Sequence, residues 1–221
     1  IIGPAASGKT TLSQALPSRT SQVKIETPPT FREPRNIPFF SRNIFSILPC
    51  LPQIYTRKDH RFSLRDHFLY IMLLNGWHKI LKQKTLNEKS VLLLDPGPVY
   101  VFGIEILFGS GWKKSTSLQR FWDKAYQSWA NTMDMVVYLD TELTVLFDRI
   151  YVRETDHTVK GITEENAMQY LESYRQVYES ILSQLSACST SLKILRLDTG
   201  KHTLDESLDI IIQNLQLEND R

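Results

Sequence analysis

Gly3-Pro4-Ala5-Ala6-Ser7-Gly8-Lys9-Thr10 stands almost at the start of the sequence and has the spacing G-x-x-x-x-G-K-[ST]. This spacing is typical of a loop that binds the phosphate groups of a nucleotide. Two glycines allow backbone angles that other residues avoid, so that successive N–H groups can turn toward one anion. Lys9 is expected to reach the β- and γ-phosphates, and the Thr10 hydroxyl to bind Mg²⁺. The residues predicted to contact the triphosphate are Gly3, Ala5, Ala6, Ser7, Gly8, Lys9, Thr10 and Thr11.

The flanking residues place this loop between a strand and a helix. Ile1-Ile2 has the apolar character of the end of a buried strand, and residues 10–16 are expected to form a helix that Pro17 ends. The helix would point the positive end of its dipole at the bound anion. Because the sequence begins without Met and inside this first strand, we expect a few residues to precede Ile1.

Strands and helices alternate along the rest of the chain, which predicts an α/β fold with a parallel sheet and right-handed crossovers. Thr141, Thr163 and Thr203 are expected to begin helices, the last of them through a capping box with Glu206. The further strands are predicted at 22–26, 90–95, 135–140 and 192–198, and long helices at 63–83, 115–131 and 163–185. We interpret residues 1–221 as one domain, with the ligand at the carboxyl ends of the strands.

Composition and charge narrow the class of protein. The chain has 221 residues, 42% hydrophobic and 23% charged, and a formal net charge of +2. These values are ordinary for a globular domain and give no signal for nucleic acid or membrane surfaces. We find no apolar run long enough to span a bilayer and no signal peptide. Cys50 and Cys188 do not form a disulfide framework and are expected to be reduced and buried, as in a cytoplasmic protein.

A proline- and arginine-rich segment covers about residues 27–62. A long irregular segment in a compact domain is usually a lid or a binding segment, and we assign this one to the acceptor. Its apolar residues 39–48 are expected to form a short helix that faces the core, and the alternative is a surface that faces lipid. Its arginines would either bind an anionic acceptor or lie at the surface: Arg32, Arg35, Arg42, Arg57 and Arg61.

Two further features suggest chemistry on a triphosphate. Asp95 ends an apolar strand, where a carboxylate can help to position Mg²⁺ opposite Thr10. Arg149 and Arg153 are four residues apart and are expected to share one helix face. Two like charges at that spacing repel each other unless an anion lies between them, and a transferred phosphoryl group is such an anion. The alternative is a solvated face that the neighbouring acidic residues neutralise.

The order of these motifs resembles the deoxynucleoside kinases and their relatives, the thymidylate kinases, over most of the chain. Ile25-Glu26-Thr27-Pro28 looks like the Glu-Pro that follows the second strand of that family. Residues 91–95 occupy the place of its buried strand ending in an acid. Arg149-Ile150-Tyr151-Val152-Arg153 matches its lid pattern, and Gly161-Ile162 and residues 170–172 also look like the family. The phosphate loop and the lid are the specific parts of this resemblance.

The resemblance implies a three-layer phosphate-loop fold, with a parallel five-stranded sheet in the order 2-3-1-4-5, helices on both faces and an arginine-bearing lid at about 149–162. It implies ATP and Mg²⁺ as cofactors, with Thr10 and Asp95 at the metal. Glu26 would be the general base, while Lys9, Arg149 and Arg153 would neutralise charge on the transferred group. The residues implied to contact the nucleotide base are Asp198, Thr199 and Gly200, and those implied to bind the acceptor are Glu26, Arg32, Arg35 and Arg65.

The sequence also departs from that family. Pro96 follows Asp95 where the family has arginine, and Thr155 stands where the family has a third lid arginine. The long helix lacks a clear counterpart of the family's base-reading glutamine and arginine, and Arg65 or Asp66 would substitute. These departures affect recognition of the acceptor and leave the phosphate machinery intact.

We therefore expect an ATP-dependent small-molecule kinase, similar to a nucleoside kinase, which transfers the γ-phosphoryl group to an acceptor hydroxyl. One alternative is a nucleoside monophosphate kinase in which Arg32 or Arg35 holds the acceptor phosphate. Another is a regulatory protein that binds a nucleotide and contacts a partner through residues 37–54. A homodimer is possible in each case.

Overall fold

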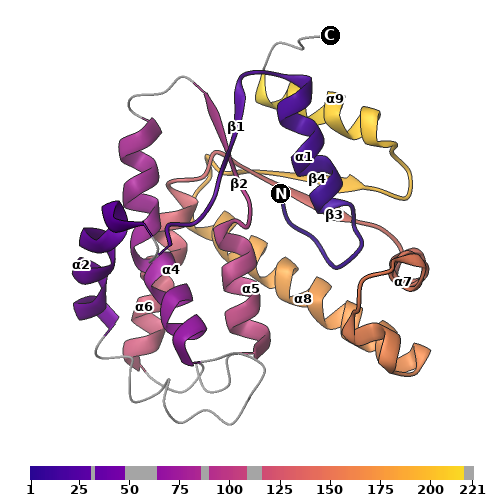
Figure 1. Ribbon diagram of the computed structural model, residues 1–221, viewed down its shortest axis with the longest axis horizontal. Helices are drawn as coiled ribbons and strands as arrows, with labels where there is room; N and C mark the ends of the chain where they lie inside the picture. The colour runs from indigo at the N-terminus through magenta and orange to yellow at the C-terminus, as the bar shows by residue number, and fades with distance from the viewer. Residues whose placement is uncertain (31–32, 48–63, 86–89, 109–115, 217–221) are drawn as a thin grey trace.

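The computed structural model describes residues 1–30, 33–47, 64–85, 90–108 and 116–216 (Figure 1). Four strands alternate with helices in this part of the chain. The strands are β1 (Val23–Glu26), β2 (Val91–Leu94), β3 (Met135–Asp140) and β4 (Lys193–Asp198). The helices are α1 (Lys9–Arg19), η1 (Pro34–Asn36), α2 (Ile37–Ile47), α4 (Leu64–Thr85), α5 (Pro98–Phe108), α6 (Thr116–Ala130), α7 (Leu143–Val152), η4 (Thr158–Gly161), α8 (Glu164–Cys188) and α9 (Leu204–Leu215).

The strands lie between two layers of helices. Successive residues of β3 point to opposite sides, because side chains alternate along a strand. Val137 and Leu139 pack among buried residues of α1 and α9, such as Leu12 and Ile211. Val136 and Tyr138 face the larger apolar cluster that α4, α5, α6 and α8 form. Figure 1 shows α1 and α9 together on one side of the strands and these four helices on the other. The predicted α/β class with helices on both faces is confirmed.

The strands are parallel, as predicted, and those of the described residues form two pairs, which do not show the predicted five-stranded sheet. β1 pairs with β2 and β3 pairs with β4. Ile2 forms one parallel bridge to Tyr138, in which its N–H donates to the Val137 carbonyl over 2.8 Å. A cavity of about 480 Å³ lies beside this bridge, between β2 and β3.

Three local features differ from the sequence-based expectation. Pro17 does not end α1, which continues to Arg19. A proline in the last turn of a helix costs only one hydrogen bond. Arg19 also stabilises this turn through ion pairs of 3.0 and 2.9 Å with α9. Thr141 does not cap α7; the N-cap residue is Glu142, and Thr141 is buried. Helix α5 was not predicted, because its sequence is apolar on all sides and has no helical period.

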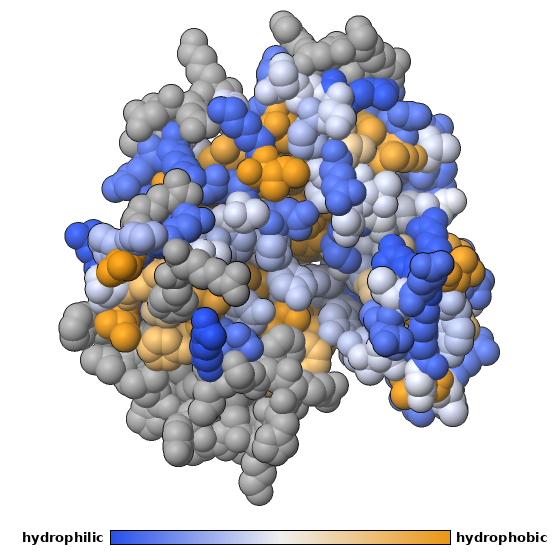
Figure 2. Space-filling view, in the orientation of Figure 1, coloured by the Kyte–Doolittle hydropathy of each residue, from blue (hydrophilic) through white to orange (hydrophobic). Residues whose placement is uncertain are grey.

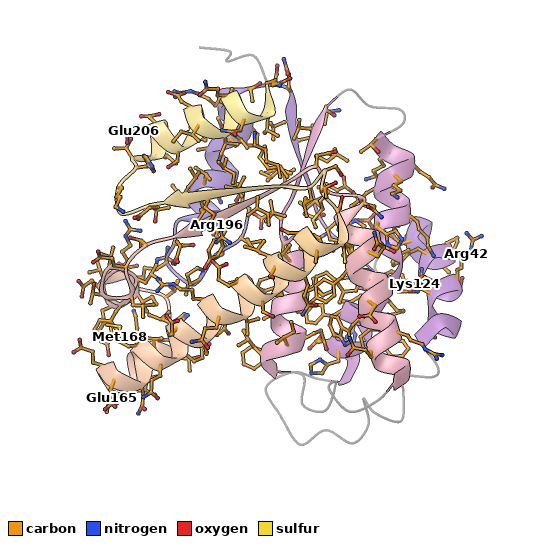
Figure 3. The ribbon with its side chains drawn as sticks, turned by 180° about the vertical axis from the view of Figure 1, so that it is seen from behind. Arg42, Lys124, Glu165, Met168, Arg196 and Glu206 are labelled. Atoms are coloured by element: carbon orange, nitrogen blue, oxygen red, sulfur yellow. The ribbon has the colours of Figure 1, made fainter. Side chains whose placement is uncertain are left out.

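Other expectations are confirmed. Thr163 caps α8, and Thr203 forms a capping box with Glu206, which Figure 3 labels at the start of α9. In the acceptor segment, α2 faces the core, because Phe40 is buried in a cluster with residues of α4. Cys188 is a free cysteine, but it is only half-buried, and Cys50 lies outside the described residues. Among the described residues, no helix has both the length and the apolar character needed to cross a membrane.

Candidate active site

The predicted phosphate loop joins Ile2 to α1, and its backbone explains the residues that form it. Gly3 has φ of +152° and Gly8 has φ of +89°, both in the region that glycine favours. A Cβ atom at Gly3 would lie only 2.2 Å from the Leu139 carbonyl oxygen and 2.6 Å from Ser7 Oγ. Ser7 is fully buried, and its Oγ has no hydrogen-bond partner among the described residues. A cradle with an unsatisfied hydroxyl inside it is suited to an anion such as phosphate.

Lys9 lies over this loop and is held there by the loop itself. Its Nζ donates to the carbonyl oxygens of Gly3 at 2.9 Å and Pro4 at 2.7 Å. Burial, followed by the nearby charge of Arg153, lowers the pKa of Lys9 from 10.5 to about 8, while Asp95 acts in the opposite direction. The charges of the lid arginine and of the acid that ends β2 thus both act on the Lys9 amine. A cation confined in this way is suited to the phosphates of a nucleotide.

Asp95 and Thr10 are brought together by Ser13, a residue that the sequence analysis did not identify. Ser13 Oγ donates its proton to Asp95 Oδ2 over 2.8 Å, and the same oxygen lies 3.3 Å from the Thr10 carbonyl oxygen. Asp95 and Thr10 are both exposed, so their other oxygen atoms face solvent. This donor set fits Mg²⁺, which prefers a few protein oxygens together with phosphate and water. Ser13 could have been found from its position one turn after Thr10 on the same helix face.

Glu26 ends β1 beside Asp95, but its carboxylate is already engaged. Its backbone carbonyl accepts from the Asp95 N–H over 3.2 Å, so the two predicted acids lie at the ends of adjacent strands. Lys84, in the last turn of α4, forms an ion pair with Glu26 Oε1. No sequence pattern indicates this contact, because 58 residues separate the partners. A general base at Glu26 would therefore act next to a lysine.

Arg149 and Arg153 do not share a helix face, which corrects the prediction from their spacing. Helix α7 ends at Val152, and Arg153 is already extended, with φ −69° and ψ 143°. Arg149 donates to Thr199 Oγ1 over 3.0 Å and to the Thr199 carbonyl over 2.8 Å. Arg153 is exposed and lies close enough to Lys9 to affect its pKa. The two arginines thus differ in their contacts, because Arg149 is bonded to Thr199 whereas Arg153 is exposed beyond the end of the helix.

A cavity of about 270 Å³ separates the phosphate loop from the β4–α9 loop. Gly8 and Thr11 line one side, Arg149 and Arg153 the second, and Thr199 and His202 the third. Figure 2 shows mainly hydrophilic side chains on the lobe formed by α7, η4 and the start of α8, and a hollow between this lobe and the rest of the surface. The cavity is therefore placed to hold the nucleoside part of a nucleotide whose phosphates lie in the loop.

Two of the three residues predicted at the nucleotide base shape this loop rather than line the cavity. Asp198 Oδ1 accepts from the Gly200 N–H over 2.9 Å, and this bond, followed by the ion pair with Lys201, lowers the pKa of Asp198. The Thr199 N–H donates to the Asp140 carbonyl over 2.9 Å. Gly200 packs against Thr141, which explains why Thr141 is buried instead of capping α7.

Gly200→Ala is expected to weaken nucleotide binding about tenfold. The new Cβ would lie 2.4 Å from Thr141 Oγ1, so the loop must move and Thr199 must lose its two bonds to Arg149. Two hydrogen bonds at about 0.5–1.5 kcal/mol each correspond to roughly this change. Calorimetric titration with an ATP analogue measures it. Thr141→Ala in the same protein removes Oγ1 and should restore the affinity; an unchanged affinity in the single variant would contradict the prediction.

The residues predicted to bind the acceptor are the part of the site that the structure describes least. Arg32, Arg57 and Arg61 lie outside the described residues, as does the side chain of Arg35. Arg65 is exposed in the first turn of α4. Arg42 is exposed on α2, and in Figure 3 it projects at the opposite edge of the molecule from α7. The acceptor assignments other than Glu26 therefore stay predictions.

Comparisons with known proteins identify the family. The sequence model of the deoxynucleoside kinases matches residues 1–215. Among solved structures, the chain is similar to deoxyadenosine kinase from M. mycoides with bound dATP, with a TM-score of 0.51 and 17% sequence identity. That match covers 98% of this chain and 97% of the other, and it shows a shared fold. Comparison with curated proteins finds no match. Together with the phosphate loop and the lid, the family match shows that this chain belongs to the deoxynucleoside kinase family, whose members are phosphotransferases that use ATP.

Proposed function

We propose that this protein transfers the γ-phosphoryl group of Mg²⁺-bound ATP to a hydroxyl group of a deoxynucleoside. The observation that carries the proposal is the Lys9 amine held over the glycine loop by two carbonyls, with Arg153 lining the cavity beside the loop and Asp95 bonded to the helix that follows it. One side of this arrangement supplies positive charge for the transferred group and the other supplies a carboxylate for the metal. The family supports a nucleoside acceptor.

Each predicted residue has a role in this proposal. Lys9 and Arg153 stabilise the charge on the transferred group, and the Thr10 hydroxyl and Asp95 would hold Mg²⁺, which would supply further positive charge to the phosphates. Arg149 and Thr199 enclose the nucleoside part of ATP. Glu26 accepts the proton of the acceptor hydroxyl, which requires this carboxylate to exchange or share its contact with Lys84.

Two finer features of the predicted fold and assembly are also proposals. The parallel bridge between Ile2 and Tyr138 supports Ile1-Ile2 as part of a central strand, with the order 2-3-1-4-5. The homodimer is proposed from the resemblance alone. Neither feature is needed for the chemistry described above.

The proposed function is tested by measuring ADP release with ATP and Mg²⁺ against a panel of acceptors. The panel contains the four deoxynucleosides, the ribonucleosides, dTMP and simple sugars, and Lys9→Met is the control for contaminating kinases. We expect release with one or more deoxynucleosides that disappears in Lys9→Met. Release with dTMP alone would instead favour the nucleoside monophosphate kinase, and no release with any acceptor would contradict the proposal.

The affinity for ATP is expected to fall as the pH rises above about 8. Burial holds the pKa of Lys9 at about 8 in the free protein, and a bound triphosphate favours the charged amine and raises this pKa. Below pH 8 the amine is charged with or without nucleotide, so the affinity is constant. Above pH 8 binding takes up a proton, and Kd should rise by up to about tenfold per pH unit.

Calorimetric titration with a non-hydrolysable ATP analogue, between pH 7 and 9.5 and in buffers of different ionisation enthalpy, measures both Kd and proton uptake. Lys9→Arg is the control, because a guanidinium stays charged over this range and should remove the dependence. A constant Kd for the unaltered protein across this range would show that Lys9 does not contact the phosphates.

A further inference from the structure

Arg175, in the middle of α8, is bound to the residues that end β3. Its Nε lies 2.8 Å from Asp140 Oδ2, and its Nη2 donates to Asp140 Oδ1 over 3.1 Å. The same Nη2 donates to the Thr141 carbonyl over 2.6 Å. Glu172, one turn earlier on α8, accepts from Nη1 over 3.3 Å. Because a guanidinium is planar and carries its donors in a fixed arrangement, these contacts hold both the side chain and the backbone of the strand end.

The end of β3 in turn supports the β4–α9 loop. The Thr199 N–H donates to the Asp140 carbonyl over 2.9 Å, and Gly200 packs against Thr141. Thr199 also accepts both hydrogen bonds of Arg149, and these two residues line the cavity beside the phosphate loop. A continuous series of hydrogen bonds therefore joins the guanidinium on α8 to the cavity that is placed to hold the nucleoside part of ATP.

A second ion pair between α8 and this pair of strands provides a comparison. Arg196 of β4, which Figure 3 labels, donates from Nη2 to Glu179 Oε2 of α8 over 2.7 Å. Within the part of the chain that the structure describes, the Arg196 side chain forms no hydrogen bond or ion pair with the β4–α9 loop. Both arginines thus join α8 to a strand, but only Arg175 holds the residues on which the loop rests.

We propose that Arg175 is a positioning residue for ATP: it fixes the end of β3 so that Thr199 and Arg149 enclose the nucleoside part of the nucleotide. It acts through Asp140 and Thr141 and does not itself contact ATP. This inference rests on the proposed function, in which the cavity beside the phosphate loop holds that part of ATP. Groups that bind a ligand need support from a surrounding set of contacts to keep their geometry, and Arg175 supplies that support on this side of the site.

The experiment compares two ligands by calorimetric titration in the presence of Mg²⁺. Inorganic tripolyphosphate can occupy the phosphate loop alone, whereas a non-hydrolysable ATP analogue also fills the cavity. We expect Arg175→Ala to raise the Kd of the analogue by about tenfold, because the charge-assisted hydrogen bonds that hold the strand end are lost. The Kd of tripolyphosphate should not change, because Lys9 is held by carbonyls of the phosphate loop itself. In the kinase assay the KM for ATP should rise while kcat at saturating ATP is kept.

Three further variants separate positioning from a general effect on the fold. Arg196→Ala, the matched control, also breaks an ion pair of α8 and should leave both Kd values unchanged. Arg175→Lys should recover part of the affinity for the analogue, because lysine keeps the charge but not the planar donors. Asp140→Ala leaves the Thr141 carbonyl bond in place and should have a smaller effect. Combined with Arg175→Ala, it should add nothing, because the two substitutions break the same contact.

An Arg175→Ala variant that binds the analogue as well as Arg196→Ala does would overturn the proposal. An equal loss of affinity for the analogue and for tripolyphosphate would also overturn it, since a loosened fold weakens both. Urea unfolding shows whether Arg175→Ala is folded, and if it is not, Asp140→Ala carries the same comparison of ligands. These binding results do not depend on turnover, whereas failure of the proposed function would appear as absence of ADP release by the unaltered enzyme.

Discussion

Arg153→Ala is expected to lower kcat by about 10³-fold while changing the affinity for ATP only a few-fold. Arg153 follows the end of α7 and lines the same cavity as Gly8 of the phosphate loop, where it can meet the charge that develops on the transferred phosphoryl group. An arginine in this role contributes about 10³–10⁵ to the rate of phosphoryl transfer, and the exposure of Arg153 favours the lower end. An interaction made mainly in the transition state lowers kcat and leaves ground-state binding nearly intact.

The measurement is steady-state ADP release, with the affinity for ATP obtained separately by calorimetry. Arg149→Ala is the matched comparison, because Arg149 contacts Thr199 and should mainly raise the KM for ATP, by about tenfold. Arg153→Lys should recover part of the lost rate, because lysine keeps the charge but not the planar donors of arginine. Equal effects of the two alanine variants on kcat and on KM would contradict the separate roles of Arg153 in the transition state and of Arg149 in ATP binding.

The parts of the fold that follow from local patterns were predictable from the sequence. β3 occupies the predicted residues, and Thr163 and Thr203 begin α8 and α9, because short-range capping and alternating apolar residues define these elements. The phosphate loop was predictable for a similar reason. The loop has positive φ at two positions, and glycine adopts such angles most readily. This requirement is local, so it is visible in the spacing of the glycines along the chain.

The parts that were not predictable depend on contacts distant in the sequence. The ion pair of Glu26 with Lys84 has no signal in the spacing of residues, and the spacing that places Ser13 on the helix face of Thr10 does not indicate its bond to Asp95, 82 residues away. Arg149 lies within α7, whereas Arg153 follows its last residue. This difference depends on where the helix ends, and helix ends are set partly by tertiary contacts. The acceptor site is the extreme case, since Arg32 and the side chain of Arg35 lie outside the described residues.

Gly3→Ala is expected to destabilise the protein by several kcal/mol and to abolish nucleotide binding. The φ of +152° at Gly3 is strained for any residue with a side chain, at a cost on the order of 1–3 kcal/mol. The Cβ atom would also lie 2.2 Å from the backbone oxygen of Leu139 in β3. A rigid backbone atom cannot move aside, so overpacking adds about 1–3 kcal/mol more. Gly3 also supplies a carbonyl to Lys9, and a shift of this residue would displace the lysine from the phosphate site.

Urea unfolding measures the first effect, and calorimetric titration with an ATP analogue measures the second. Alanine substitutions at two other glycines distinguish backbone strain from steric overlap. At Gly8, φ is +89° but no atom lies within 4 Å of a new Cβ, so Gly8→Ala carries conformational strain alone, of about 1–2 kcal/mol. At Gly161 in the lid, φ is not positive and the space is open, so alanine should leave the unfolding midpoint unchanged or slightly raised. If Gly3→Ala unfolded at the same urea concentration as Gly161→Ala, the close approach of the loop to β3 could not be what fixes its shape.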